Sequence, residues 1–450
     1  MAKRSKQLPE ARSAIVPDAA GIDIGGETHF AAVPKDRAER PVRSFGSFTA
    51  DLNALAAWFR ECRIKTVVVE STGVFWMPVC DHLEAAGFEV LLVDPRTLTR
   101  HLRKKSDVTD CQFLQELLAA GLLKGCFRPP AQVRALRTLW RHRAHLVVES
   151  ARLLQMMQKT LVQMNVHLQL VVADVAGETG MRILRAIVKG CRDPRKLAAF
   201  RNYRCRRSEA EIAKALDGVW DDAHLFELKQ LLQAWDFQRR QLAACDRRFE
   251  KECSAMPDRS DGQPPPESKA QRRGRSEPAL DGRGLVFRMT GVDLCAIDGL
   301  GANTALAVLA ETGPDVSRFP TDKHFASWTG LAPRRDQSGK RKRTPSPPAS
   351  GANRVANAFR LAAQSLIKSQ TVLGCFLRRM KARLGPGPAI RATACKLAKL
   401  FWRLLAKRER YRREDVAAYE AGFQERRKRW LARQAAALGL ALTPVFAPPT

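Results

Sequence analysis

Two short stretches, Ala19-Ala-Gly-Ile-Asp-Ile-Gly25 and Thr66-Val-Val-Val-Glu70, decide the fold of the N-terminal part of this chain. The second is a run of β-branched residues, which is typical of a strand buried on both faces. The first has the pattern of a strand, and His29–Val33 is its expected hairpin partner. Both strands end on a carboxylate residue or close to one, so the pattern bears on function as well as on fold.

Helices alternate with these predicted strands. Helical spacing covers Leu52–Phe59 and Trp76–Ala86, another apolar strand covers Glu89–Asp94, and helices continue to about Leu123. Alternating strands and helices predict an α/β sheet that is covered on both faces. The segment Arg128-Pro-Pro130 ends this unit.

The rest of the chain has helical patterns. A stretch without Gly or Pro from Ala131 to about Leu170, with Arg residues on its polar face, and further helices up to Phe249 predict a helical bundle or an antiparallel coiled coil. The fold class is therefore α/β plus α. The predicted organisation is a basic disordered arm (1–16), the α/β domain (17–127), a helical assembly region (128–256), a flexible linker (257–284), a mainly helical C-terminal domain (285–405) and a basic helical tail (406–450).

Composition bounds the function. The 450 residues have a formal net charge of +31, and 45% of them are hydrophobic, as in a globular protein. No run of about 18 apolar residues is long enough for a membrane span, and the N-terminus lacks the apolar core of a secretory signal. Eleven cysteines stand singly, without zinc-site spacing, which favours reduced thiols. We expect a soluble, cytoplasmic protein that binds a polyanion rather than a membrane.

Four carboxylates of the first domain are candidate metal ligands. Asp23 and Glu70 lie at predicted strand ends, where α/β sheets bind their ligands, and Asp107 and Asp110 share one face of a helix start. Converging carboxylates need a cation, and hard oxygen ligands select Mg²⁺ or Mn²⁺. Each residue also has a structural interpretation, such as a turn at Asp23 or a helix cap at Asp107. Spacing alone leaves the two interpretations evenly balanced.

The last domain contains two candidate nucleic-acid motifs. Gly299-Leu-Gly301 is expected to form a tight turn between two helices, a helix–hairpin–helix pattern whose amides can hold a phosphate. Ser338 stands in a loop rich in Arg and Lys, where its hydroxyl could attack a phosphate that the guanidinium groups neutralise. By composition alone, an ordinary basic surface loop is favoured over a catalytic one.

The ordered set of motifs carries a family resemblance. The set comprises Gly21-Ile-Asp-Ile24, Val69-Glu-Ser-Thr-Gly73, Lys105-Ser-Asp-Val-Thr-Asp110, Ile297-Asp-Gly-Leu-Gly301, Arg318-Phe-Pro-Thr-Asp-Lys-His324 and Gln337-Ser-Gly339. In this order, from about residue 17 to 440, the chain resembles the DEDD-type insertion-sequence transposases of the IS one-ten family, which are bridge-RNA-guided serine recombinases.

The resemblance implies a fold and a chemistry. The first domain would be RuvC-like, of the ribonuclease-H fold, with Asp23, Glu70, Asp107 and Asp110 as a Mg²⁺-binding tetrad. Ser338 in the C-terminal transposase domain would attack a DNA phosphodiester and form a covalent phosphoserine link. The surrounding residues Arg334, Arg335, Lys340 and Arg341 would bind nucleic acid, as would the turn at Gly299 and Gly301. The basic run Lys340–Arg343 and the Pro-rich segment after it depart from the family pattern, which leaves open which Arg contacts the scissile phosphate.

The resemblance also implies partners. They are donor and target double-stranded DNA, a bridge RNA that pairs with both, and further copies of the chain in a homo-oligomer, expected to be a dimer of dimers in the bacterial cytoplasm at the nucleoid. RNA guidance agrees with the lack of a sharp base-reading motif, because base pairing then supplies the sequence specificity. Two alternatives stay open from the residues: a hydrolytic metal-dependent RuvC-type nuclease or junction resolvase, and a non-catalytic nucleic-acid-binding derivative.

Overall fold

The computed structural model describes residues 15–71, 73–94, 107–267, 274, 277–333, 337–338, 341–342 and 353–443, with the backbone only at 107, 108, 337, 338, 341 and 342. The chain divides into two compact units, Met1–Arg128 and Pro129–Thr450. The predicted order of an α/β part followed by a mostly helical part is confirmed. None of the helices in the described ranges has the length and apolar character to cross a membrane.

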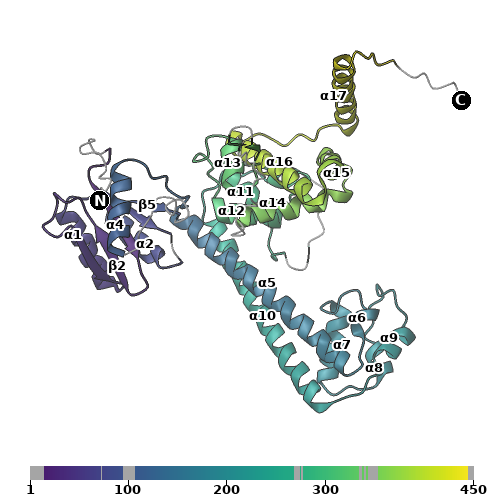
Figure 1. The fold of residues 1–450 in the computed structure, drawn as a ribbon. Coiled ribbons are helices and arrows are strands. Elements are labelled where there is room, and N and C mark those ends of the chain that lie inside the picture. Colours follow the sequence, from purple (N-terminus) through teal and green to yellow (C-terminus); the bar gives the residue numbers. More distant parts are fainter. Residues whose placement is uncertain are drawn as a thin grey trace, which may run out of the picture. The chain divides into compact units, whose positions relative to one another are not determined.

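The first unit is built on one five-stranded sheet (Figure 1). Its strands are β1 (Ala19–Ile24), β2 (Thr28–Ala32), β3 (Val42–Gly46), β4 (Thr66–Glu70) and β5 (Glu89–Val93). Their order in the sheet is β3-β2-β1-β4-β5. The pairs β1–β2 and β2–β3 are antiparallel, whereas β1–β4 and β4–β5 are parallel. The sheet is thus a three-stranded meander extended by two parallel strands.

Helices cover both faces of this sheet, as the alternating pattern predicts. They are α1 (Thr49–Glu61), α2 (Trp76–Ala85) and α4 (Asp107–Ala119). Because successive side chains of a strand point to opposite faces, β1 contributes to two cores. One core lies on the side of α1 and α2 and includes Ala20, Ile22, Val67, Val69, Leu55, Phe59 and Leu83. The other lies on the side of α4 and includes Ala19, Val68, Val93, Leu114 and Leu118.

Two long helices form the framework of the second unit. They are α5 (Ala131–Gln163) and α10 (Asp222–Ser254), each of 33 residues, and they pack side by side in Figure 1. They run antiparallel, since Trp140 near the start of α5 contacts Phe249 near the end of α10, with ring centroids 5.0 Å apart. This pairing agrees with the predicted helical bundle or antiparallel coiled coil.

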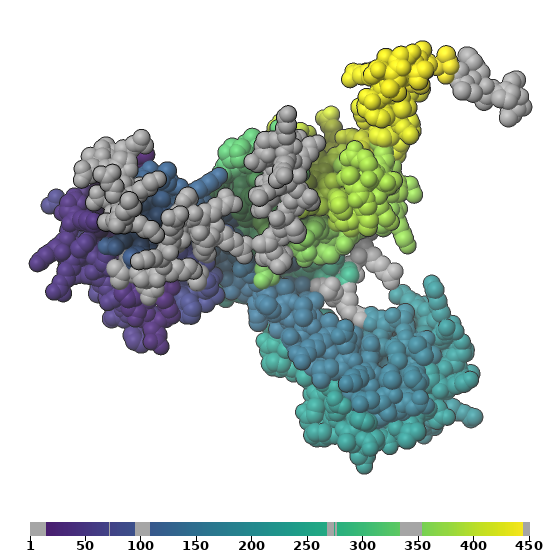
Figure 2. Space-filling model, in the orientation of Figure 1, coloured from purple at the N-terminus to yellow at the C-terminus, as the bar shows by residue number. Residues whose placement is uncertain are grey.

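The segment between α5 and α10 folds into a small helical module with its own core. We call residues 164–221 the tip module; it contains α6 (Leu168–Val171), α7 (Glu178–Val188), α8 (Pro194–Ala198) and α9 (Glu209–Ala215). Its core packs onto the adjoining ends of the long helices and includes Met157, Leu161, Ile183, Leu184, Ile187, Leu197, Ile212, Leu228 and Leu232. In the space-filling view the module is the teal body at the end of the helix pair (Figure 2).

The remainder of the second unit is helical. It comprises α11 (Gly282–Thr290), the 3-10 turn η1 (Leu294–Ala296), α12 (Ala302–Thr312), α13 (Asp322–Trp328), the two-residue strands β6 (Gln337–Ser338) and β7 (Arg341–Lys342), α14 (Arg354–Ser365), η2 (Leu366–Lys368), α15 (Val372–Leu384), α16 (Pro386–Lys407) and α17 (Val416–Ala437). Three buried rings hold α13, α14 and α16 together. Phe401 lies 6.2 Å from Phe325 and 5.6 Å from Phe359, measured between ring centroids.

A buried carboxylate joins α12 to α5. Only 6% of Glu311 is exposed, and its side chain accepts two hydrogen bonds from Arg141, each of 2.8 Å. Arg137 Nε lies 3.0 Å from the same carboxylate. Burial, the largest effect, and the neighbouring arginines lower the pKa of Arg137, whereas Glu311 raises it. The Arg-rich face of α5 therefore includes a partly buried ion-pair cluster around Glu311.

The structure corrects two sequence expectations and adds one strand. The helix predicted from Ala131 to about Leu170 ends at Gln163, because Asn165 adopts a left-handed conformation with φ 56°. The tail predicted to be helical from 406 to 434 is interrupted: α16 ends before Arg408, which has φ 52°, and α17 begins after the capping residue Asp415. Strand β3 was not predicted, since Arg43 and Ser44 at its centre are exposed.

The predicted disordered arm lies, as far as residue 14, outside the described residues. At the start of the predicted linker, Arg259 N donates a 2.8 Å hydrogen bond to Arg288 O in α11. Helix α11 itself begins at Gly282, inside the predicted linker range. The domain limits stay a prediction.

Candidate active site

Two of the predicted carboxylates lie level with each other in the sheet. In the parallel pairing of β1 with β4, Ile22 is opposite Val69, so that Asp23 and Glu70 occupy the next position along each strand. Both residues are half-buried. Side chains alternate along a strand, and Ala19 and Val68 face α4. Asp23 and Glu70 therefore project from the α4 face, at the carboxyl ends of their strands.

Helix α4 brings the third carboxylate to the same end of the sheet. Near its C-terminus, Ala119 O accepts a 3.1 Å hydrogen bond from Val16 N, just before β1 begins. Near its N-terminus, Cys111 lies against Gly21 in β1. The helix thus runs antiparallel to β1, and its first turn lies where β1 and β4 end. This turn contains Asp107 and Asp110.

The contact between α4 and β1 depends on a missing side chain. A Cβ atom at Gly21 would lie 2.3 Å from Cys111 O and 2.6 Å from Gln115 N, closer than side chains approach backbone atoms. Only glycine permits this distance, as at other close backbone contacts. In the sequence, Gly21 stands out only as part of a motif. Its packing role could have been suspected from a glycine inside an otherwise apolar strand.

The Cys111 thiol interacts electrostatically with two of the candidate carboxylates, Asp23 and Asp110. Burial, the largest effect, together with the charges of Asp23 and Asp110 raises the pKa of Cys111 to about 12. The thiol is therefore within the electrostatic range of both carboxylates. Cys111 was not predicted as part of the site, because a lone cysteine in a helix carries no spacing signal.

The candidate ligands are all carboxylates, whose oxygen atoms are the donors that hard cations prefer. The Oδ1 atom of Asp110 is buried and has no hydrogen-bond partner among the residues that the structure describes. The side chain of Asp107 lies outside them. Within the described ranges, no group of three or more His, Cys, Asp and Glu side chains has the spacing of a metal site. The structure thus brings Asp23, Glu70 and Asp110 to one end of the sheet without drawing them into a coordination sphere.

The serine motif is described at the backbone only. Ser338 lies in β6, directly opposite Arg341 of β7 in an antiparallel pair. The side chains of both residues, and the whole of Arg334, Arg335 and Lys340, lie outside the described residues.

The glycine turn of the C-terminal domain packs against a helix. Gly299 has φ 83°, and a Cβ atom there would lie 2.8 Å from Leu366 Cγ. Gly301 precedes α12 as its N-cap residue. The element before the turn is the 3-10 turn η1, which corrects the expected α-helix: α11 ends at Thr290, followed by Gly291 with φ 71°, and leaves too few residues for another helix before the turn.

The tail after α16 covers an acidic residue of this turn. Asp298 lies 3.1 Å from Arg413 Nε and accepts a 3.3 Å hydrogen bond from the Tyr411 hydroxyl. Burial, the largest effect, and Asp298 raise the pKa of Tyr411 to about 12. No local sequence pattern predicts this contact, because more than 100 residues separate its partners.

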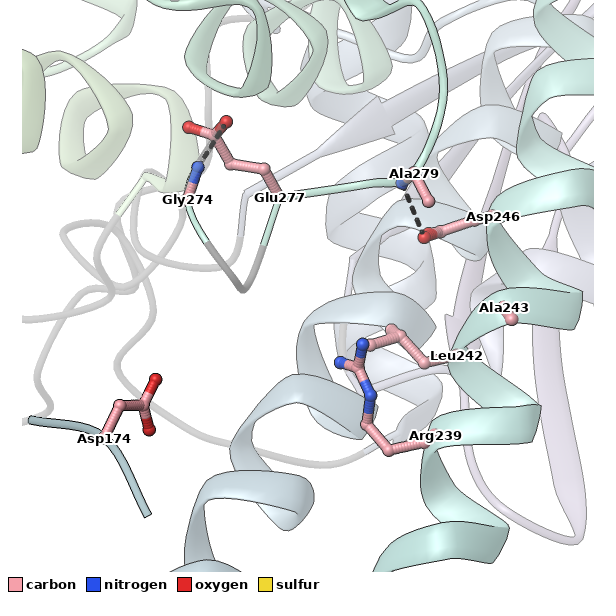
Figure 3. Close-up of a pocket in the computed structure, with 8 residues that line it drawn as sticks. All are labelled: Asp174, Arg239, Leu242, Ala243, Asp246, Gly274, Glu277 and Ala279. Carbon is pink, nitrogen blue, oxygen red and sulfur yellow. Dashed lines mark hydrogen bonds between the residues drawn. The ribbon is translucent and has the colours of Figure 1, made fainter. Parts of the chain in front are cut away.

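A cavity of about 490 Å³ in the second unit contains none of the predicted site residues. It is lined by Asp174, Arg239, Leu242, Ala243, Asp246, Gly274, Glu277 and Ala279. Figure 3 shows the Ala279 amide directed at Asp246 and the Gly274 amide directed at Glu277, with hydrogen bonds of 3.2 and 3.1 Å. Asp246 Oδ1 also accepts from the buried Arg143 at 2.6 Å. These carboxylates bind the chain itself, so the cavity has the character of a structural junction.

Comparisons with known proteins agree with the geometry. A transposase model, the DEDD type of IS110, matches residues 20–166, which contain the three described carboxylates. A second model, the transposase IS116/IS110/IS902 family, matches residues 293–374, which contain the glycine turn and Ser338. No curated protein matches the chain. The two matches lie in the expected order and together cover about half of the chain. The chain therefore belongs to the IS110 family of insertion-sequence transposases, enzymes that cut and rejoin DNA.

Proposed function

We propose that this transposase cuts and rejoins DNA through a covalent link between Ser338 and a DNA phosphate, assisted by the carboxylates of the first unit. The observation that carries the proposal is the placement of Asp23 and Glu70 at level strand ends, with the first turn of α4 on the same face. We further infer that the first unit is RuvC-like. The strand order β3-β2-β1-β4-β5, with an antiparallel meander and two parallel strands, supports this fold.

Asp23, Glu70, Asp107 and Asp110 are proposed to hold Mg²⁺, with Mn²⁺ as a substitute, because their ligands are all oxygen atoms. The unpartnered, buried Oδ1 of Asp110 supports this assignment. When bound, such a cation supplies positive charge to the oxygens of a phosphodiester. The four carboxylates are also a group of negative charges in a protein of net charge +31, which further supports a cation site there.

In the proposed step, the Ser338 oxygen forms a bond to phosphorus as the bond from phosphorus to a sugar oxygen breaks. The serine proton passes to a base, and the departing sugar oxygen acquires a proton. Rejoining reverses these changes with a new sugar hydroxyl. Because a serine hydroxyl is a weak nucleophile at neutral pH, a base or a strongly positive surrounding must activate it. Arg334, Arg335, Lys340 and Arg341 are proposed to bind the phosphate, with Gly299 and Gly301 contacting nucleic acid nearby.

Partners are also part of the proposal. A bridge RNA would select donor and target DNA, and the high positive charge would offset phosphate charge on all three nucleic acids. The antiparallel pair α5–α10 is proposed as a coiled coil that assembles the protomers into a dimer of dimers. The chain is expected to act at the bacterial nucleoid. The domain limits predicted from the sequence are kept as part of the proposal.

Trapping the covalent adduct tests the proposal. Purified protein with its flanking noncoding RNA is incubated with end-labelled donor DNA and Mg²⁺, and the products are separated on a denaturing gel. The parent protein should retain label, and mass spectrometry should identify a nucleotide on Ser338. Ser338→Ala should abolish the adduct, whereas Ser346→Ala, in the same sequence segment, should keep it.

Asp23→Asn should reduce adduct formation by at least about a hundredfold, as expected for the loss of a metal ligand from an active site. An adduct that persists in Ser338→Ala refutes the serine assignment. Cleavage without any adduct favours a hydrolytic nuclease instead. Sequencing RNA that co-purifies with the protein tests the guide separately, and the absence of RNA from the flanking DNA would contradict RNA guidance.

A further inference from the structure

The tip module carries a concentrated positive charge that the proposed chemistry does not use. Residues 182–207 contain ten Lys and Arg residues and a single acidic residue, Asp193. This stretch lies outside both family matches, which end at residue 166 and begin again at 293.

Half of these cations have structural partners. Arg182, Arg185 and Arg207 form ion pairs with Glu178, Asp236 and Glu211. Arg192 and Arg201 donate to backbone carbonyls. Even Asp193 is engaged by the backbone, because its carboxylate accepts a 2.9 Å hydrogen bond from Arg195 N at the start of α8.

The other cations form an exposed set, which we call the tip patch: Lys189, Arg195, Lys196, Arg204 and Arg206. Among the residues that the structure describes, none of the five forms an ion pair. These five exposed charges of one sign outnumber the single acidic residue of the stretch, and a polyanion would relieve their mutual repulsion. A second copy of this surface would add to the repulsion.

An aromatic ring stands exposed within the tip patch. Tyr203 is 78% exposed, and Phe200, three residues earlier, is 38% exposed. The guanidinium of Arg204 lies 5.2 Å from the centroid of the Tyr203 ring, and its Nε donates a 2.8 Å hydrogen bond to the Tyr203 hydroxyl. The arginine thus steadies the ring in solvent.

The turn that carries this ring is held rigidly. Arg201 donates to Arg207 O at 2.6 Å and to Cys205 O at 2.7 Å, so that one guanidinium spans the turn from inside. The backbone amide of Asn202 donates to Thr179 Oγ1 in α7 at 3.0 Å. An exposed aromatic side chain on a fixed backbone loses little conformational freedom on binding, which makes it an effective contact.

We propose that the tip patch binds a single-stranded segment of nucleic acid, with an unpaired base stacked on Tyr203 and the flanking phosphates bound by the exposed Arg and Lys side chains. Aromatic rings interleaved with cations are the usual means of binding unpaired nucleotides, because each base offers a face for stacking and each nucleotide a phosphate. Duplex DNA would contact the cations but would offer no unpaired base to stack on the Tyr203 ring. The proposal rests on the proposed function only in that this transposase has nucleic-acid ligands.

Photo-crosslinking of the full chain tests it. A 12-nucleotide RNA with a central 4-thiouridine is irradiated with the protein, and the crosslinked residue is identified by mass spectrometry. We expect a crosslink within residues 200–206. Tyr203→Ala should weaken binding of this RNA by about 5- to 100-fold, the loss expected for one stacked base, whereas Tyr203→Phe should retain it.

The cations are tested by the dependence of binding on salt. Replacing Arg204 and Arg206 by Gln should reduce the slope of log K against log salt concentration by about 0.7 for each phosphate that is no longer neutralised. The matched control, Lys229→Gln with Arg247→Gln on α10, should leave the crosslink in place.

Two outcomes would overturn the proposal. If the cation variants weaken binding but Tyr203→Ala does not, and the RNA crosslinks elsewhere, the patch binds phosphate backbones such as duplex DNA. If the variants change the oligomeric state by mass photometry and leave RNA binding intact, the patch is a protein interface. The same assays in Ser338→Ala protein separate this proposal from the catalytic one, because binding at the tip should survive loss of the serine.

Discussion

Replacing Gly21 by Ala should move a helix that carries two proposed catalytic carboxylates. The new Cβ atom would lie 2.3 Å from Cys111 O, whereas contacts under 3.0 Å are essentially never seen, so α4 must retreat by about 0.7 Å. The first turn of α4, with Asp107 and Asp110, moves with it. Overpacking of this kind costs about 1–3 kcal/mol of stability. A displacement close to 1 Å at a catalytic group can reduce the rate about a hundredfold.

Two assays separate these effects. Urea unfolding measures the loss of stability, and adduct formation at a temperature where the variant remains folded measures the loss of activity. Gly387→Ala is the matched control, because a Cβ atom there meets nothing within 4 Å. A Gly21→Ala protein that keeps full activity while folded would refute the idea that the close approach of α4 to β1 sets the position of the carboxylates.

Three further predictions concern the rest of the molecule. Glu311→Ala should destabilise the protein by about 3–5 kcal/mol in urea unfolding, because it leaves buried arginine charges without a carboxylate partner. Loss of the exposed Glu425–Arg429 pair should cost under about 0.5 kcal/mol. Equal effects would contradict the buried cluster. Tyr411→Phe should release the tail from Asp298 and increase trypsin cleavage between residues 408 and 413, as mapped by mass spectrometry; an unchanged pattern would contradict a docked tail. In the folded state, burial raises the pKa of Cys111, Cys253 and Cys295 to about 12 from a reference value of 9.0. Stability should therefore fall as pH rises from about 9 towards 12, because only the unfolded state releases these protons in this range. Replacing the three cysteines by Ala should flatten this fall in urea unfolding, and an unaltered slope would contradict the prediction.

Local pattern was enough to locate the central strands. Thr66–Glu70 is the same in prediction and structure, because a β-branched run buried on both faces leaves no other local choice. Strand β3 was missed because it lies at the sheet edge, where exposed side chains remove the hydrophobic signal. The position of Asp23 and Glu70 at strand ends followed from the same pattern. Their register did not, since it depends on pairing across more than 40 residues.

Ion pairs between residues far apart in the sequence could not be predicted from local patterns. Arg143 has the sequence pattern of a solvated helix face, yet it is only 4% exposed and pairs with Asp246. Nothing in the local sequence of α5 reveals a carboxylate 103 residues away. The same holds for Glu311 and its arginines. Asp415 and Gly291 each mark a helix boundary through local capping chemistry, but neither boundary was predicted, because the predicted helical stretches run across both.

The two ends of the tip module are hydrogen-bonded to each other. Val219 N donates to Met164 O at 2.9 Å, and His167 N donates to Ala215 O at 2.8 Å. A segment whose entry and exit touch can be exchanged, shortened or enlarged while its host helices keep their spacing, provided that the replacement also covers the apolar ends of α5 and α10. The module can thus be replaced as a unit; with the tip patch binding nucleic acid as proposed, such a replacement would change this binding and leave the proposed catalytic residues unchanged.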